Sequence, residues 1–443
     1  MAYTLVSDFH GRQYRVGESA TDLIGRSRAW MLRAPLIAMA AAGLLQYGLA
    51  ATLPALARTN GWSSAEALCL LGVWVACQAG VAAPATWLYR RSGARPGRLL
   101  TIAAVLCGVG LATPAHTGSV ALVLVGYSVL GGLGAGLVYV VCIGVATEWF
   151  PERVAGVTGA VSGAFGYGAV PFVLVAYLVD ARPVVFDAAA VLAALAVFGA
   201  ALVVRRPPEH WWPAQLDPRL WALDRRLNRS IPNNAPAIRV HHPADALRSG
   251  MLPLMWVLVG VIAAMALFDL AYLGTSGGGV ATGGVAPVIG VLALATGLAR
   301  VGTGRLSDRV GRRRMLMAAL LLGGLAQFGL LAGVSGDRPA AVVLSAAVAG
   351  AGTGAGYSLL VGLVRDWFGE EATLANYGLV YTGKAVGGAG GLLLAAATPA
   401  AERVDASGRL AAFAVAGALG VIGALAAAKL RRPGRPFLPP PGR

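Results

Sequence analysis

Residues 304–313 read GRLSDRVGRR and separate two long apolar runs. Gly304 and Gly311 allow the backbone to turn tightly. Asp308 can cap or pair with a neighbouring helix end, and Arg309 and Arg312 can bind the charged surface of a membrane. The alternative is a generic basic loop. The apolar runs on both sides favour a short turn between two membrane-spanning helices.

The composition of the whole chain is typical of a membrane protein. Of its 443 residues, 57% are hydrophobic and 13% are charged, and the mean hydropathy is +0.68. Globular domains have about a quarter of their residues charged. The formal net charge of +16 does not indicate a nucleic-acid partner, because the basic residues lie in loops between apolar runs and not on one face.

Twelve apolar runs have a length that suits, or nearly suits, a bilayer crossing. In the first half they are 34–56, 66–88, 99–113, 119–147, 156–178 and 184–204. In the second half they are 251–274, 284–306, 315–334, 339–365, 375–398 and 408–430. The third run is short and the fourth is overlong. We expect an all-α membrane protein with about twelve transmembrane helices in two six-helix bundles, 34–204 and 251–430.

The distribution of lysine and arginine predicts the orientation, because basic residues near helix ends stay on the cytoplasmic side. With the amino terminus inside, 28 of the 36 basic residues fall in cytoplasmic segments and five on the opposite side. We therefore predict a multi-pass protein of the plasma or inner membrane with both termini in the cytoplasm. Its cytoplasmic parts would include the amino-terminal segment 1–33, the central linker 205–250 and the tail 431–443.

An internal repeat relates the two halves at an offset of 218 residues. The matched positions are Gly132, Gly134 and Gly136 with Gly350, Gly352 and Gly354; Tyr139 with Tyr357; and 149–152 with 367–370. A single offset for a helix and a loop predicts two parallel halves, related by an axis along the membrane normal. That arrangement allows a central site to open alternately to either side.

Three ionisable residues lie inside predicted spans, where a charge is costly unless it faces a partner or a water-filled cavity. Arg300 precedes Asp308 by eight residues, about 12 Å along a helix, and Lys384 lies at similar depth in its own run. Asp269 is either a charge partner for one cation or a group that takes up a proton. The excess positive charge predicts a small anionic substrate. Arg300 could bind a carboxylate through two hydrogen bonds, and Lys384 could act as a point charge.

The stretch 304–313 resembles the signature loop of the major facilitator superfamily. The resemblance implies the major facilitator fold and a gating role for this loop, through Gly304, Asp308, Arg309, Gly311 and Arg312. The counterpart in the first half, residues 88–95, departs from the pattern, because Arg90 stands where the offset predicts an acidic residue.

Other residues resemble the oxalate/formate antiporter family of anion exchangers. The shared marks are Gln46-Tyr47, the glycine-rich run into Tyr139, 148–153, the proline-tryptophan segment 207–213, Arg300 eight residues before Asp308, and 376–384. The resemblance implies that Arg300 and Lys384 bind substrate carboxylates. It also implies that Gln46, Tyr47, Tyr139 and Tyr357 line the cavity, although tyrosines at such positions, judged from the residues alone, are more often core or helix-packing residues.

These observations predict alternating-access secondary transport of small organic anions, by exchange or by proton symport. Oxalate, formate, lactate and pyruvate are the expected substrate types. The expected partners are the substrate and the lipid bilayer, with a monomeric chain and without a cofactor, metal, ATP or nucleic acid. The alternatives are a facilitator for a drug, sugar or other metabolite, and a non-transporting membrane sensor of solutes. A membrane-embedded enzyme would need a nucleophile, base or metal-ligand cluster inside the spans, and the sequence shows none.

Overall fold

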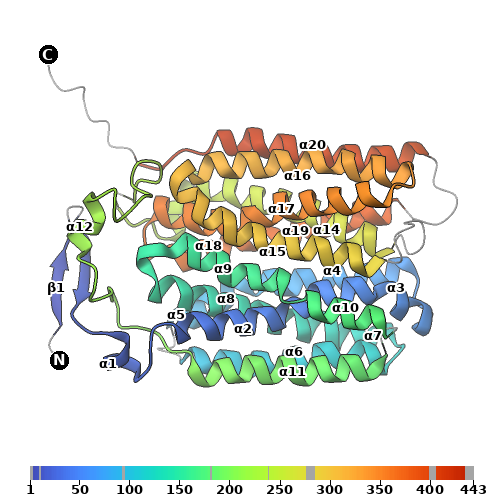
Figure 1. The fold of residues 1–443 in the computed structure, drawn as a ribbon, viewed down its shortest axis with the longest axis horizontal. Coiled ribbons are helices and arrows are strands. Elements are labelled where there is room, and N and C mark those ends of the chain that lie inside the picture. Colours follow the sequence, from blue (N-terminus) through green and yellow to red (C-terminus); the bar gives the residue numbers. More distant parts are fainter. Residues whose placement is uncertain are drawn as a thin grey trace, which may run out of the picture.

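The computed structural model describes residues 3–8, 11–91, 95–179, 182–237, 239–275, 285–398 and 406–434. In this part of the chain, twelve helical segments are long and apolar enough to cross a membrane. The predicted all-α fold with about twelve spans is therefore confirmed. The helices lie side by side along the long axis of the molecule (Figure 1).

Six spans form the first half. They comprise α2 (Trp30–Gly43), a π-helical turn (Leu44–Gly48) and α3 (Leu49–Asn60); α4 (Ser64–Gly80) and α5 (Ala82–Arg91); α6 (Pro96–His116); α7 (Val120–Val123), a second π-helical segment (Leu124–Gly131) and α8 (Gly132–Trp149); the single turn Pro151–Arg153, α9 (Val154–Tyr167) and α10 (Val170–Leu178); and α11 (Pro183–Val203). The third span is longer than the predicted run 99–113, because Pro96 opens the helix at a position where its missing N–H leaves no hydrogen bond unmade.

The other six spans form the second half. They comprise α14 (Met251–Thr275), α15 (Val285–Val310), α16 (Arg312–Ser335), α17 (Pro339–Phe368), α18 (Thr373–Tyr381) with α19 (Gly383–Ala396), and α20 (Ala406–Ala428). Two short helices, α12 (Pro218–Leu223) and α13 (Pro243–Arg248), lie in the linker between the halves.

A small hairpin precedes the first span. Strands β1 (Thr4–Ser7) and β2 (Gln13–Val16) pair antiparallel, and the short helix α1 (Ala20–Ile24) follows. The hairpin docks on the linker, since the Arg15 N–H donates to the His210 carbonyl at 2.8 Å and the Trp212 N–H donates to the Arg15 carbonyl at 3.0 Å. Elements β1, α1 and α12 therefore gather at one end of the helix bundle (Figure 1).

The 218-residue repeat is also a repeat in packing. A Cβ on Gly136 of α8 would lie 2.5 Å from the Gln78 carbonyl oxygen of α4, and a Cβ on Gly354 of α17 would lie 2.5 Å from the Thr296 carbonyl oxygen of α15. Gln78 and Thr296 are themselves 218 residues apart. Glycine is needed at both places because the helix backbones meet so closely.

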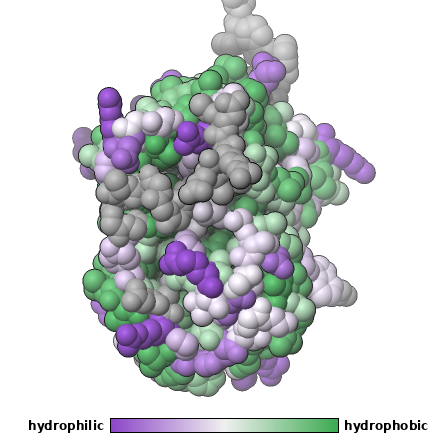
Figure 2. All heavy atoms as spheres, turned by 90° about the vertical axis from the view of Figure 1, so that its right-hand side faces the viewer, coloured by the Kyte–Doolittle hydropathy of each residue, from purple (hydrophilic) through white to green (hydrophobic). Residues whose placement is uncertain are grey.

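The flanks of the molecule are suited to lipid. Large aliphatic side chains such as Leu178, Leu192, Leu393 and Leu425 are exposed there, and lipid tails are as apolar as leucine. Figure 2 shows the end face opposite the hairpin, with hydrophilic residues across its middle and hydrophobic residues along its sides. This distribution fits a multi-pass protein whose ends face water.

Candidate functional site

Lys384 binds across the interface between the two halves. It lies in the first turn of α19 and is 3% exposed. Its Nζ donates to the side-chain oxygens of Gln46, at 2.8 Å, and Gln78, at 3.0 Å. Both acceptors belong to the first half, and Gln46 lies in its π-helical turn. The amides satisfy hydrogen bonds of the ammonium group but leave its positive charge without a counter-charge.

Arg300 is held in a similar way. It is buried in α15, and its Nη1 donates to the Ser162 carbonyl oxygen of α9 at 2.9 Å. The guanidinium carbon lies 4.6 Å from the centre of the Tyr357 ring. Its Nε has no hydrogen-bond partner among the described residues. The ion pairs recorded in the described ranges include neither Arg300 nor Lys384.

The two cations face one region of the interface. Arg300 binds Ser162, and the Lys384 Nζ lies 5.6 Å from the ring centre of Phe165. These two partners are three residues apart on α9, which is less than one helical turn. The helix α9 of the first half therefore contacts both cations of the second half at the same depth.

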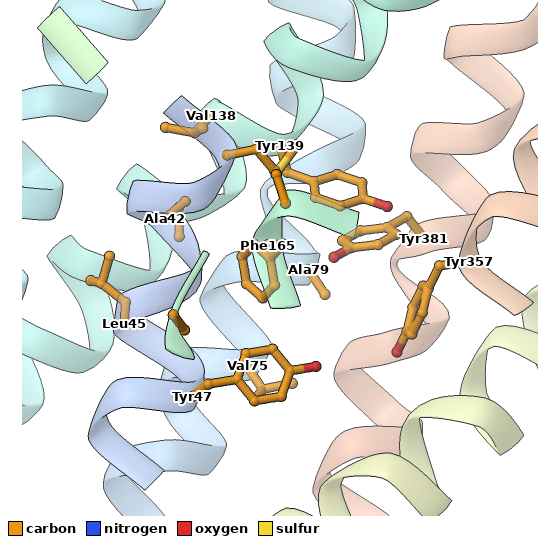
Figure 3. Packing of buried hydrophobic residues seen from close by; sticks show 14 of the residues in the cluster. Ala42, Leu45, Tyr47, Val75, Ala79, Val138, Tyr139, Phe165, Tyr357 and Tyr381 are labelled. Atoms are coloured by element: carbon orange, nitrogen blue, oxygen red, sulfur yellow. The ribbon is translucent and has the colours of Figure 1, made fainter. Parts of the chain in front are cut away.

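Aromatic rings surround this region. Figure 3 shows Tyr47 and Tyr139 of the first half and Tyr357 and Tyr381 of the second half turned toward a shared space. Tyr139 stacks on Tyr381 with ring centres 4.3 Å apart. The structure thus brings together all six residues predicted to bind substrate: Arg300, Lys384, Gln46, Tyr47, Tyr139 and Tyr357.

The site is closed in this conformation. Arg300, Lys384, Gln46 and Tyr47 are each at most 5% exposed. A neighbouring cavity lined by Tyr139, Tyr377 and Tyr381 has a volume of about 10 Å³, which is room for about one water molecule. Substrate entry at this place would therefore require the two halves to separate.

Several residues of the site were missing from the sequence prediction. Gln78 accepts from Lys384 and donates its amide to the Tyr381 hydroxyl at 3.0 Å. The Tyr377 hydroxyl lies 3.1 Å from that of Tyr139. The sequence contained a signal for each of these residues. Gln78 is a polar residue inside an apolar run, and Tyr377 and Tyr381 belong to the stretch 376–384.

Asp269 lies apart from the two cations. It is 1% exposed in α14, and its Oδ2 accepts a hydrogen bond from the Gln327 Nε2 at 3.1 Å. No ion pair of Asp269 occurs in the part of the chain that the structure describes. The placement therefore does not support Asp269 as a charge partner of Arg300 or Lys384, and its alternative role as a proton-binding group stays a prediction.

Asp308 and Arg312 of the predicted gating loop form a partly buried charge cluster with Asp366. The Arg312 Nη2 donates to Asp308 at 3.0 Å, and Nη1 of the same residue binds Asp366 at the end of α17. The central linker fastens the loop as well, because Asn234 donates to the Ser307 carbonyl at 2.9 Å and accepts from the Arg312 N–H at 2.9 Å.

Two further loop residues contact neighbouring segments. The carbonyl oxygen of Arg309 accepts from the Asn233 side chain. Gly304 packs on the carbonyl oxygen of Ala155, where a Cβ would overlap it. Since Ala155 belongs to α9, the loop of the second half touches the first half.

In the first half, an arginine from another segment pairs with the acidic residue at the equivalent helix end. Glu148 precedes Asp366 by 218 residues, and Arg206 of the linker binds both of its oxygens, at 2.7 and 3.0 Å. Arg90, which replaces the expected acidic residue, lies near the end of α5. Residues 92–94 of that predicted counterpart lie outside the described residues. The acidic helix end of each half is thus held by an arginine, but in the first half the linker supplies it.

Gly311 is expected to be indispensable for the turn. It alone joins α15 to α16, with φ +98° and ψ 129°, a conformation that is nearly restricted to glycine. Gly311→Ala should lower the free energy of unfolding by about 1–3 kcal/mol, measured as a lower thermal denaturation midpoint in detergent. Gly302→Ala is the control, since a Cβ there meets nothing within 4 Å and alanine favours a helix. Equal midpoints for the two variants would contradict the strain argument.

Comparisons with known proteins agree with this architecture. Residues 36–293 and 254–443 match the family described as Major Facilitator Superfamily. A Thermoproteus tenax protein described as "Uncharacterized 38 kDa protein in 23S RNA operon" is 27% identical over 415 residues, which are 92% of this chain and 97% of the relative. The "Uncharacterized MFS-type transporter YhjX" of Escherichia coli K12 is 24% identical over 332 residues, or 72% of this chain and 74% of the relative.

A solved structure has the same fold. The xylose transporter XylE from E. coli, in a partially occluded inward-open conformation, superposes with a TM-score of 0.62 at 15% sequence identity. The superposition covers 90% of this chain and 98% of XylE. At this identity the likeness concerns the fold alone.

Proposed function

The chain belongs to the major facilitator superfamily, and from this premise we propose that it transports small organic anions, mono- or dicarboxylates, by alternating access. It is a multi-pass membrane transporter and not an enzyme. The proposal rests on one observation: Arg300 and Lys384 are buried together at the interface of the halves, and among the described residues neither has a carboxylate partner.

Electrostatics favours an anion at this place. Burying a charge is costly unless a counter-charge and hydrogen bonds accompany it. A carboxylate could accept from the Arg300 guanidinium and the Lys384 ammonium and so offset the cost of enclosing both. An uncharged sugar would leave both charges uncompensated, and a cation would be repelled.

The same electrostatics suggests how binding is coupled to movement. Without an anion, two like charges that repel each other would have to enter a dry interface when the halves close. A bound anion lowers the free energy of the closed conformation relative to the open ones, and a ligand shifts an equilibrium only through such a difference. In this scheme the exchange of one anion for another is favoured, and net transport by symport requires the slower closure of the empty site.

We also place both termini in the cytoplasm. Supporting this, β1, α1 and α12 lie at one end of the bundle, and 28 of the 36 basic residues are assigned to that side by the rule that positive charges stay inside.

Counterflow in proteoliposomes tests the substrate class. Vesicles with the purified protein would be preloaded with unlabelled oxalate, formate, lactate or pyruvate and given the same labelled solute outside. We expect at least one carboxylate to exchange well above protein-free vesicles, while xylose and a lipophilic cation do not. Counterflow of xylose or of the cation, with none of the four carboxylates exchanging, would overturn the proposed substrate class but not the fold.

A further inference from the structure

One buried carboxylate differs from all others in the described ranges. Four acidic residues are buried there: Asp8, Glu152, Asp269 and Asp366. Three have an arginine partner, namely Arg12 for Asp8, Arg28 for Glu152 and Arg312 for Asp366. Asp269 has the neutral amide of Gln327 instead. An ionised carboxylate would thus be buried at Asp269 without a cation, which costs several kcal/mol.

The unpartnered atoms of this pair suggest what offsets the cost. Asp269 Oδ2 accepts from the Gln327 amide N–H, while Asp269 Oδ1 and Gln327 Oε1 are both buried without a hydrogen-bond partner. Both are acceptors when the carboxylate is ionised. A proton on Oδ1 would turn that oxygen into a donor, and the free oxygen of the same amide could accept from it. One proton would satisfy both atoms.

We propose that Asp269 is the proton-binding site of this transporter and that it is protonated in the closed conformation, in a two-hydrogen-bond acid–amide pair with Gln327. The inference rests on the proposed anion transport. Of the two coupling modes, exchange and proton symport, it favours proton symport. The proton site is separate from the anion site, because Asp269 and Gln327 join α14 to α16 inside the second half.

The surroundings of the pair are apolar. Phe268 and Tyr272, which flank Asp269 on α14, pack on Phe413 of α20, with ring centres 5.1 and 4.9 Å from it. The charged or titratable groups on the elements packed against α14 are Arg58 on α3, Arg300, Arg305, Asp308 and Arg309 on α15, Arg312, Arg313 and Arg314 on α16, Tyr357, Arg365 and Asp366 on α17, Tyr377 and Tyr381 on α18, Lys384 on α19, Arg409 on α20, and Asp245 and Arg248 on α13. None of them forms an ion pair or hydrogen bond with Asp269 among the interactions recorded for the described residues.

Helix α14 provides the link between proton and transport. Near the carboxyl end of α14, a Cβ on Gly274 would lie 3.1 Å from the Ala50 carbonyl oxygen of the first half. Near the amino end of the same helix, the Trp256 side chain donates to Thr382, two residues before Lys384, at 2.9 Å. Asp269 precedes the helix end Thr275 by six residues, about 9 Å. When the halves part at this end, the Gly274 contact opens and water can reach Asp269 to exchange the proton.

Two transport assays separate the proton site from the anion site. Asp269→Asn keeps the shape and the bond to Gln327 but cannot bind the proton; Asp187→Asn, a half-exposed carboxylate beside His116, is the control. In proteoliposomes with an acidic outside, we expect native protein and control to accumulate the exchanged carboxylate. Asp269→Asn should retain counterflow but lose accumulation driven by the proton gradient. Gradient-driven accumulation equal to native would overturn the inference.

Infrared spectroscopy tests the protonated state without any substrate. At neutral pH we expect the C=O stretch of a protonated carboxyl group in the native protein and in Asp187→Asn, and its loss in Asp269→Asn. If the native protein lacks this band, the inference is wrong, whether or not the variant folds. If the band is present but no carboxylate exchanges, the proposed function fails while the protonation of Asp269 stands.

Discussion

Arg300→Gln and Lys384→Gln are each expected to abolish carboxylate counterflow in proteoliposomes. Glutamine keeps hydrogen-bonding capacity at both positions but removes the charge that would bind the anion. Removing one partner of a buried charge-assisted contact costs about 2–5 kcal/mol, which corresponds to roughly 30-fold to several thousand-fold weaker binding. The measurement is the initial rate of labelled carboxylate uptake into preloaded vesicles, over a range of substrate concentrations.

The chain offers a matched control for each substitution. Arg305 lies in the same helix as Arg300 but is exposed, and Lys429 is the other lysine of the chain and is also exposed. Arg305→Gln and Lys429→Gln should leave counterflow near the native rate. Arg300→Lys should bind substrate more weakly than native, because an ammonium group cannot form the two parallel hydrogen bonds of a guanidinium. Counterflow that is indifferent to both Arg300→Gln and Lys384→Gln would refute the assignment of the binding site.

Asp366→Ala is expected to destabilise the protein strongly. The change leaves the Arg312 guanidinium buried beside an apolar side chain, and loss of one partner of a buried ion pair costs about 3–5 kcal/mol. We expect the lower end, about 3 kcal/mol, because Asp308 still accepts from the Arg312 Nη2 at 3.0 Å. The thermal denaturation midpoint of purified protein in detergent, with native helix content as the readout, measures the change.

Two comparisons show whether the isolated charge is the cause. The double variant Arg312→Leu with Asp366→Leu removes both charges and should be more stable than Asp366→Ala, since apolar residues can replace a buried ion pair at little cost. Glu148→Ala in the first half should be milder, because the Glu148 side chain is 25% exposed and that of Asp366 10%. A double variant as unstable as the single one would show that packing, and not the uncompensated charge, determines the loss.

The membrane fold was predictable from local properties of the sequence. The length of an apolar run decides whether it can span a bilayer, and the 218-residue offset needs only identities such as Tyr139 with Tyr357. The structure adds the reason for the repeated glycines, which lie where helix backbones meet. The amino-terminal hairpin was not predicted, because it depends on the distant linker residues His210 and Trp212.

About twelve spans, two related halves and two cations inside the spans were predictable without the structure, because run length and a charge within an apolar run are properties of neighbouring residues. The contacts of each ionisable group became visible with the folded bundle. Lys384 binds Gln46, 338 residues away, and Asp269 binds Gln327, 58 residues away. Such partners depend on how each helix is rotated and on which helices lie beside it. A sequence of almost uniformly apolar spans leaves that choice to the packing of the complete bundle.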